Sequence, residues 1–397
     1  MFRKIFSLVL VISMVLALGL GFTSCGDKDD DAKDIKVGFI CLHDETSTYD
    51  LNFINAAKAA QKALGLSDDQ VIIKRNIPES IACYETALDL VDEGCDVIFA
   101  NSFGHESFML QAAKENPDVQ FCHATGTMAH TAGVKNFHNA FASIYEGRYL
   151  AGVAAGMKLN EMIANGDITP AQAKMGYVGA FTYAEVISGY TSFYLGAKSV
   201  CPSVTMDVKF TGSWFDPTAE MNAANDLISG GCVLISQHAD SMGAPGACEA
   251  AGVPNVSYNG STQSACPNTY IVSSRIDWQP YFELMIKNTQ EGKDIPTDYC
   301  GDLSTGSVKL TDVNTSVAAE GTVEAIEAAK AKLMNGELNV FDTANFTKNN
   351  VKVTSYKVEG QEVIKNGVFD ESGSLRSAPY FDIQIDGIRL LNTAFGD

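Results

Sequence analysis

The sequence repeats one pattern twice, at a spacing of 137 or 138 residues. Three short segments of the first half return in the second half in the same order. Three matches at nearly one offset are hard to obtain by chance, and each half is long enough to bury a core of its own. The chain is therefore predicted to fold as two lobes of equivalent topology. The matched segments are Lys36–Phe39 with Lys174–Gly179, Asp89–Cys95 with Asp226–Cys232, and Pro117–Val119 with Pro254–Val256.

Within each half, short apolar runs alternate with helical patterns. Strands separated by helices of ~10–15 residues predict right-handed βαβ units and a parallel sheet. The fold class is therefore α/β, with two Rossmann-like lobes whose strands end at a shared cleft. In the first half the predicted strands are Ile35–Ile40, Val71–Lys74, Asp96–Ala100 and Val119–Cys122, and the predicted helices are Asn52–Leu64, Ile81–Glu93 and His105–Glu115.

The two lobes are expected to exchange segments. Lobe 1 comprises residues 35–142 and a returning helix at 277–295, and lobe 2 comprises residues 143–274 and a returning segment at 298–336. Several crossings between two lobes form a hinge, and hinge closure encloses a ligand in the cleft. The predicted crossings are near Phe141–Tyr145, Ser273–Asp277 and Pro296–Leu303.

Residues 340–397 depart from the repeated pattern. We expect them to form a β-rich C-terminal extension beside the lobes, with short strands within Val351–Gln361, Glu362–Phe369 and Tyr380–Ile388. Gly152 and Gly156 lie inside a helical pattern, where small residues allow a second helix to approach closely.

Residues 1–25 have the layout of a secretory signal, because two basic residues precede an uncharged apolar run, Ile5–Leu20, and Cys25 follows it. This layout resembles a bacterial lipoprotein signal, in which the cysteine is acylated and becomes the first residue of the mature chain. Phe22 stands where such signals usually carry Leu. The alternative is an uncleaved anchor helix, because the uncharged stretch is just long enough to span a bilayer. In both cases an acidic linker, residues 26–34, tethers an extracytoplasmic body to the cell membrane.

The charge of the chain excludes one class of partner. Lys and Arg number 28 against 48 Asp and Glu, which gives a net charge of −20. Recognition of a phosphate backbone requires a basic surface. Nucleic acid is therefore not expected to bind.

The motifs of common enzymes and metal sites are absent from the sequence. It contains no GxSxG, HExxH or GxxxxGK[ST] pattern, and its six His show no metal-ligand spacing. Besides Cys25 there are nine Cys without a CxxC pair, among which Cys248 and Cys266 flank one short αβ stretch and are candidates for a disulfide. We therefore expect no catalytic residue, metal or cofactor. A hydrolase stays open as an alternative, because catalytic triads are spatial rather than sequential.

Polar and aromatic residues follow the predicted strands at the ends that face the cleft. Aromatic rings with a few amides and carboxylates suit a flat, neutral, heteroaromatic solute. Almost no Lys or Arg lies at these ends, with Arg275 as the exception, so an anionic ligand is not expected. The alternatives are core packing for each aromatic, a helix N-terminal charge for Glu185 and a hinge-facing hydrogen bond for His238. The candidate ligand-binding residues are Tyr49, Phe103, Gly104, Glu185, Trp214, His238, Asp240, Ser241, Asn259 and Trp278.

Two motifs, Tyr145–Gly152 (YEGRYLAG) and Gln237–Ser241 (QHADS), are similar to those of the basic-membrane-protein (BMP) family of substrate-binding lipoproteins. The resemblance covers about Lys36–Val308 and implies a type I periplasmic-binding fold, an ABC permease as partner, and a purine nucleoside or an adenine-like base as ligand. The adenine-like base is the ligand implied for the branch of the family that carries the QHxDS motif. One position departs from that branch, because Ser47 stands where a base-stacking Trp is usual. Either Tyr49 supplies the stacking surface or the ligand differs.

A second function of another class fits the same fold. A sensory or signalling lipoprotein uses the same closure around a different small solute to engage a membrane partner. A permease and an ATPase encoded beside the chain favour transport, whereas a kinase or a chemoreceptor favours sensing.

Overall fold

The computed structural model describes residues 34–396, and the chain divides into one unit up to Lys33 and a second unit from Asp34 onward. The predicted signal peptide, Cys25 and nearly all of the acidic linker lie outside the described residues. Within 34–396, no helix combines the length and the apolarity that crossing a membrane requires.

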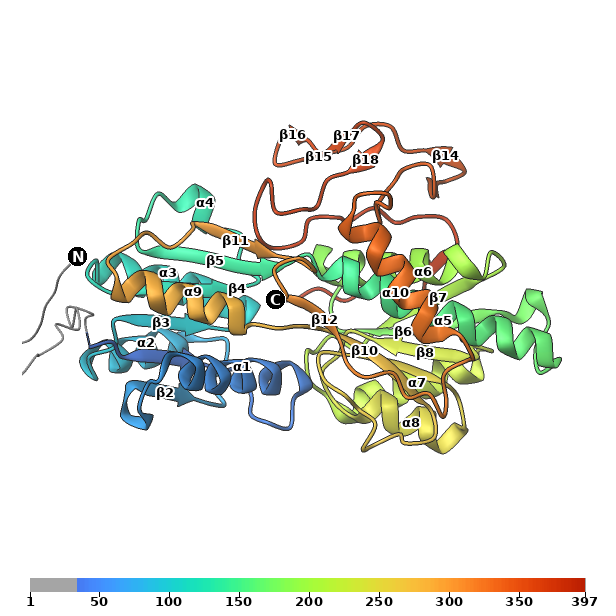
Figure 1. The fold of residues 1–397 in the computed structure, drawn as a ribbon, viewed down its shortest axis with the longest axis horizontal. Helices are drawn as coiled ribbons and strands as arrows, with labels where there is room; N and C mark the ends of the chain where they lie inside the picture. Colours follow the sequence, from blue (N-terminus) through green and yellow to red (C-terminus); the bar gives the residue numbers. More distant parts are fainter. Residues whose placement is uncertain (1–33, 397) are drawn as a thin grey trace, which may run out of the picture. The chain divides into compact units, whose positions relative to one another are not determined.

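Lobe 1 is built on a six-stranded sheet in the order β11-β5-β4-β3-β1-β2 (Figure 1). All its neighbouring strands run parallel. One face packs against α1 and α9 and the other against α2 and α3, so apolar clusters lie on both sides of the sheet. Its strands are β1 Val37–Ile40, β2 Val71–Lys74, β3 Val97–Ala100, β4 Gln120–Ala124, β5 Phe137–Ala142 and β11 Asp298–Gly301, and its helices are α1 Thr48–Leu64, α2 Ile81–Asp92, α3 Glu106–Glu115, α4 Ala129–Ala132 and α9 Gln279–Gln290.

Lobe 2 is built on a seven-stranded sheet in the order β12-β10-β9-β8-β6-β7-β19. Its neighbours run parallel except β12, which is antiparallel to β10. Its two apolar clusters lie under α5 and α6 on one face and under α7 and α8 on the other. Its strands are β6 Lys174–Gly179, β7 Thr205–Phe210, β8 Leu234–Gln237, β9 Asn255–Tyr258, β10 Tyr270–Ile276, β12 Val308–Leu310 and β19 Ile388–Leu390, and its helices are α5 Ile144–Asn165, α6 Ala184–Val200, α7 Pro217–Ser229, α8 Gly243–Ala251 and α10 Thr322–Met334.

The chain passes between the two sheets three times, from β5 into α5, from β10 into α9 and from β11 into β12. The prediction that the segment returning to lobe 2 begins at residue 298 is wrong, because residues 298–301 pair with β5 as an edge strand of the lobe 1 sheet. Figure 1 shows the consequence in colour, because the orange α9 and β11 lie among the blue and cyan elements of lobe 1. The prediction of an α/β fold with two parallel sheets is confirmed. The short apolar runs of the sequence form the central strands, and their side chains are buried on both faces of each sheet.

Helix α1 begins earlier than the sequence indicates. It starts at Thr48 rather than Asn52, because Ser47 caps it and accepts a hydrogen bond of 3.1 Å from the backbone N–H of Asp50. The cap brings Tyr49 and Asp50 into the first turn of the helix, at the cleft end of lobe 1.

Helices α5 and α6 pack at unusually close range, which confirms the role predicted for their glycines. A Cβ on Gly152 would overlap the carbonyl oxygen of Phe193, and a Cβ on Gly156 would overlap Val200 and the carbonyl oxygen of Ala197. The contact is therefore between backbones, and it fixes α5, the first element after a hinge crossing, against lobe 2.

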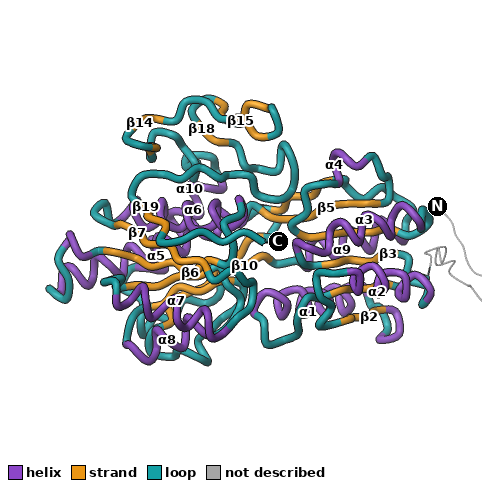
Figure 2. Tube along the Cα trace, turned by 180° about the vertical axis from the view of Figure 1, so that it is seen from behind, coloured by secondary structure: helices purple, strands orange, loops and turns teal. Residues whose placement is uncertain are grey.

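The C-terminal extension lies beside lobe 2 as a group of loops and hairpins (Figure 2). The prediction of a strand over Tyr380–Ile388 is wrong, because the N–H groups of Tyr380 and Phe381 bond the carboxylate of Glu371 instead of a neighbouring strand. Pairing resumes only at β19, which joins the lobe 2 sheet beside β7. The hairpins pair β13 Thr347–Lys348 with β14 Val351–Lys352, β15 Lys357–Val358 with β16 Gln361–Glu362, and β17 Ile364–Lys365 with β18 Val368–Phe369.

Candidate ligand-binding cleft

A cavity lies between the two lobes, at the carboxyl ends of their central strands. This is the position at which open α/β sheets bind ligands. Both lobes contribute side chains to its wall. The lining residues are Leu42, His43, Tyr49, Asp50, Ser102, Phe103, Thr125, Glu185, Trp214, His238, Asp240 and Tyr258.

Six of the ten candidate residues are brought together in this wall: Tyr49, Phe103, Glu185, Trp214, His238 and Asp240. Gly104 and Ser241 lie just behind it. Gly104 donates its N–H to the Glu79 carboxylate at 2.7 Å, and Ser241 donates its N–H to Glu220 at 3.1 Å. Both therefore support the loops that carry cavity residues.

The structure does not bring Trp278 into the cavity. Its side chain is 2% exposed and stacks on Phe53, with ring centroids 4.5 Å apart, in the apolar cluster between α1, α9 and the lobe 1 sheet. The residue follows the second hinge crossing, and the turn there directs the indole into the core. Core packing, the alternative considered for this aromatic, is what the structure shows.

The lobe 1 wall is organised around Asp50, which is fully buried. Its Oδ1 accepts hydrogen bonds from the N–H of His43 at 3.1 Å and from Asn101 Nδ2 at 2.7 Å, and its Oδ2 lies 3.4 Å from His43 Nδ1. Burial raises the pKa of Asp50, but the hydrogen bonds from His43, Asn101 and Ser47 outweigh burial and lower it below the ordinary range. Asp50 is therefore an ionised carboxylate.

Tyr49 presents its ring to the cavity, while its hydroxyl is already engaged. The Oη atom donates to the carbonyl oxygen of Asn101 at 2.7 Å, and the ring packs edge-on against Phe53 at 4.8 Å. The ring is thus held in one orientation by contacts at both ends. This rigidity suits a stacking surface better than a hydrogen-bonding group.

Behind the lobe 2 wall lies Arg148, which is 1% exposed. Its guanidinium lies 3.4 Å from the ring centroid of Tyr258 and donates to the carbonyl oxygen of Gln237 and to Nδ1 of His238, both at 2.9 Å. A guanidinium can only donate, so Nδ1 accepts and Nε2 of His238 carries the hydrogen. That Nε2 lies 3.4 Å from Glu185 Oε1.

Burial and the charge of Arg148 determine the protonation of His238 and Glu185. Burial and the neighbouring Arg148 lower the pKa of His238 well below its ordinary value, so the imidazole is neutral. Burial raises the pKa of Glu185 to about 7, although the positive charge of Arg148 opposes the rise. Near neutral pH, Glu185 is therefore poised between its acidic and ionised forms.

Asp240 lies at the centre of the contact between the lobes. Its carbonyl oxygen accepts from the N–H and the hydroxyl of Thr48 at 3.0 and 3.2 Å, and its Oδ1 accepts from Asn259 Nδ2 at 3.3 Å. Burial and the nearby carboxylates of Glu220, Asp50 and Glu185 raise its pKa well above the ordinary range. Asp240 therefore offers the cavity a carboxylic acid that can donate as well as accept.

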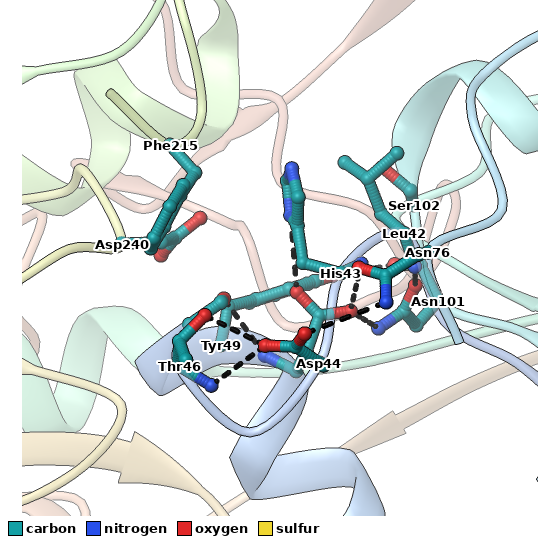
Figure 3. Close-up of polar contacts among 12 residues, drawn as sticks. Leu42, His43, Asp44, Thr46, Tyr49, Asn76, Asn101, Ser102, Phe215 and Asp240 are labelled. Carbon is teal, nitrogen blue, oxygen red and sulfur yellow. Dashed lines mark hydrogen bonds and ion pairs between the residues drawn. The ribbon is translucent and has the colours of Figure 1, made fainter. Parts of the chain in front are cut away.

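Aromatic side chains from the two lobes meet across the cleft. Phe103 stacks on Tyr183 with centroids 5.2 Å apart, and His43 lies 5.2 Å from Phe215. Figure 3 shows Phe215 and Asp240 of lobe 2 on one side, and His43, Asn101 and Ser102 of lobe 1 on the other. Together with the contact between Thr48 and Asp240, these pairs close the lobes over the cavity.

Several residues of the cavity wall, and one residue behind it, were not predicted from the sequence. His43 lies in the polar loop after β1, Asp50 lies in the first turn of α1, and Arg148 lies in the YEGRYLAG motif of α5. The available signal was that motif, because a charged residue in an otherwise apolar helix needs a buried partner.

Among residues 34–396, no group of three or more His, Cys, Asp or Glu side chains is arranged to hold a metal ion.

Comparison with known proteins places this geometry in context. Residues 58–344 match the family model named Bmp, described as ABC transporter substrate-binding protein PnrA-like. A purine-binding protein of Brucella abortus is 31% identical over 331 residues, which is 83% of this chain and 89% of that protein. A Haloferax volcanii protein with the provisional name ABC transporter glucose-binding protein is 34% identical over 251 residues, 63% of this chain and 60% of that protein.

Solved structures share the fold at low sequence identity. A solute-binding protein of an ABC transporter system from Conexibacter woesei covers 77% of this chain and 98% of its own, with a TM-score of 0.62 and 20% identity. A second solute-binding protein, from Aeropyrum pernix, covers 76% and 92%, with a TM-score of 0.63 and 18% identity.

Proposed function

Because the chain belongs to the Bmp family of PnrA-like ABC transporter substrate-binding proteins, we propose that its interlobe cleft binds a purine nucleobase or nucleoside for delivery to a membrane permease. The protein holds the solute between its two lobes and performs no chemistry on it. The similarity to a purine-binding protein over most of both chains supports this choice of ligand.

The observation that carries the proposal is the composition of the cavity wall. Rings of Tyr49, Phe103 and Trp214 line it together with the carboxyl groups of Asp50, Glu185 and Asp240, and the wall contains no Lys or Arg. Aromatic faces stack on a flat solute, and carboxyl groups bond the polar edge. Anionic solutes such as nucleotides are disfavoured, because ionised Asp50 would repel them.

The protonation states suit an edge that carries both donors and acceptors. Asp50 accepts only, whereas the raised pKa of Asp240 leaves it a proton to donate. A purine presents ring nitrogens that accept beside N–H groups that donate. Both kinds of group therefore have a complementary partner in this wall.

The membrane attachment is part of the same proposal. Acylation of Cys25 would hold the lobes at the extracytoplasmic face of the cell membrane, within reach of an ABC permease. Mass spectrometry of the N-terminal peptide from membranes tests this: a lipid-modified Cys25 is expected, and an unmodified peptide that retains residues 1–24 would indicate the anchor helix instead.

A sugar is the second candidate ligand, favoured by the similarity to the Haloferax protein. A pyranose ring also packs its apolar faces on aromatic side chains, and its hydroxyls donate to carboxylates. One observation favours the purine. The similarity to the purine-binding protein spans more of both chains.

Thermal unfolding of the purified protein in the presence of purines, pyrimidines, nucleosides and monosaccharides tests both candidate ligands, the purine and the sugar. A solute at a hundred times its Kd stabilises by about 2.7 kcal/mol, which raises Tm by several degrees. We expect the rise with adenine, guanosine or a related purine. A rise with monosaccharides alone would replace the purine proposal by the sugar. Release of free base from guanosine during incubation would instead indicate a hydrolase.

A further inference from the structure

The last residues of the chain run from the outer edge of the lobe 2 sheet toward the cleft. We call residues 388–396 the C-terminal strap; it lies beyond the part of the chain that matches the family model. Its first three residues form β19, in parallel register with Met206–Val208 of β7. Arg389 bonds both carboxylate oxygens of Asp207, at 2.8 and 2.6 Å, which fixes the strap to the sheet edge.

Beyond β19, polar contacts continue at nearly every second residue. The amide of Asn392 bonds both backbone groups of Phe210, at 2.8 and 2.9 Å. Ala394 accepts from the N–H of Thr182 at 2.6 Å and donates to its hydroxyl at 2.9 Å. Gly396 donates its N–H to Oη of Tyr183 at 2.8 Å. The strap therefore ends on the loop that leads into α6.

That loop carries the aromatic contact between the lobes. Tyr183 stacks on Phe103 of lobe 1 at 5.2 Å and on Phe181 at 5.2 Å, and Phe181 meets Trp214 edge-on at 5.1 Å. Phe103 and Trp214 both line the cavity. Tyr183 also lies 6.2 Å from the ring centroid of Trp214. The strap therefore bonds a tyrosine whose ring contacts both cavity residues, Phe103 and Trp214.

We propose that the C-terminal strap is a positioning element of the ligand site, which holds Thr182 and Tyr183 in place so that Tyr183 closes on Phe103 over the bound solute. The proposal rests on the proposed function in one respect, since it assumes that the cleft binds a solute. Phe103 and Tyr183 belong to different lobes, so hinge opening separates them. A loop that is already fixed loses less conformational freedom on closure, and this favours the closed state.

The consequence is a slower release of the solute. Closure follows encounter, so the association rate depends little on the strap, whereas dissociation requires the Phe103–Tyr183 contact to break. Without the strap, the loop at Phe181–Tyr183 moves more freely and Trp214 becomes more accessible to water. The greater exposure of Trp214 does not depend on which solute binds.

Two variants of the full chain test the proposal. A chain ending at Leu391 lacks most of the strap, and Tyr183→Phe keeps the ring but removes the hydroxyl that Gly396 bonds. Val351→Ala is the control, because Val351 is 66% exposed in a distant hairpin of the same extension.

The two readouts are acrylamide quenching of tryptophan fluorescence without solute, and the dissociation rate of adenine by stopped-flow fluorescence. The chain has two Trp, and Trp278 is 2% exposed, so quenching reports chiefly on Trp214. We expect stronger quenching in both variants, and adenine dissociation about tenfold faster in the truncated chain and about fivefold faster in Tyr183→Phe, with association nearly unchanged.

Unchanged quenching in both variants overturns the proposal, and so does altered quenching with an unchanged dissociation rate. If the truncated chain does not fold, Tyr183→Phe decides alone. If no purine binds the unmodified protein, the purine assignment is wrong, independently of the strap. The dissociation rate is then measured with the solute that raises Tm in the panel, while the quenching result stands without it.

Discussion

At the scale of single residues, Arg148 determines which hydrogen bonds the lobe 2 wall can offer. Its donation to Nδ1 of His238 leaves Nε2–H directed at Glu185, so the tautomer is set from behind the cavity. Burial and the same charge lower the pKa of His238, whereas for Glu185 the charge only partly offsets the rise caused by burial. One side chain outside the cavity wall thereby sets the tautomer of His238 and moderates the pKa of Glu185.

Asp240 gives the first prediction at this scale. Asp240→Ala removes a buried partner of the ligand edge and should weaken purine binding by about 1–3 kcal/mol, or roughly 5- to 150-fold in Kd. Asp240→Asn keeps a neutral donor and should lose less than the alanine variant. Calorimetric titration measures both, with Asp167→Ala, an exposed carboxylate of lobe 2, as the control. Equal affinity of Asp240→Ala and the unmodified protein would remove Asp240 from the site.

Glu185 gives a prediction about pH. Its pKa is raised from 4.5 to about 7 by burial, so the folded state retains the proton more tightly than the unfolded state. The stabilisation from Glu185 is therefore complete below about pH 4.5 and is lost as the pH rises through about 7. The Tm of the solute-free protein minus that of Glu185→Gln should fall across this range.

The control for this measurement is Glu337→Gln, an exposed carboxyl group after α10. Its Tm difference from the unmodified protein should stay flat over the same pH range. A flat curve for Glu185→Gln as well would mean that the carboxyl group titrates alike in the folded and unfolded states.

At the scale of elements, the contact between α5 and α6 holds the hinge side of lobe 2 together. Gly152 of α5 faces the carbonyl oxygen of Phe193, and Gly196 of α6 faces that of Tyr149, so each helix lets the other approach its backbone. Both helices are largely buried along their length. A side chain at either glycine must push the two backbones apart.

Gly152→Ala should therefore destabilise the protein by at least about 2 kcal/mol, because backbone atoms cannot yield as a flexible side chain does. Gly246→Ala is the matched control. Gly246 lies inside α8 with no atom within 4 Å of an added Cβ, so better helix propensity should stabilise by up to about 1 kcal/mol. Chemical denaturation measures both, and equal stability of the two variants would contradict the close packing.

At the scale of the whole described molecule, the C-terminal extension contacts both lobes. Glu371 accepts a hydrogen bond from Ser188 of α6 in lobe 2. Ser377 donates to Asp298 of lobe 1 at 2.8 Å, and Glu359 lies 3.0 Å from Nε2 of His130. The extension therefore joins the lobes outside the three hinge crossings.

The same scale gives a prediction for the thiols. All nine cysteines among the described residues are free, and eight of them are buried, so the Cys248–Cys266 disulfide considered from the sequence is not formed. Burial raises the pKa of Cys83, Cys122 and Cys248 to about 12, which suppresses the reactive thiolate. Protein truncated to begin at Gly26 should show nine reactive thiols after unfolding without reductant and very few before. Fewer than nine after unfolding would indicate a disulfide.

The sequence by itself determined the two lobes, their parallel sheets and the edge of the sheets at which the cavity lies. Alternating strands and helices are local patterns, and the carboxyl ends of parallel strands meet at one edge whatever the details of packing. For that reason Phe103, His238 and Asp240, each just after a predicted strand, lie in the cavity wall.

Only the tertiary structure decided which polar and aromatic residues turn inward. Both Trp278 and Trp214 were predicted to line the cleft. The turn after a hinge crossing directs Trp278 into the core, whereas Trp214 lies in the cavity wall. The tautomer of His238 depends on Arg148, 90 residues away, and the hydroxyl of Tyr183 accepts a hydrogen bond from Gly396, 213 residues away. These contacts join segments that are distant in sequence, so no local pattern records them.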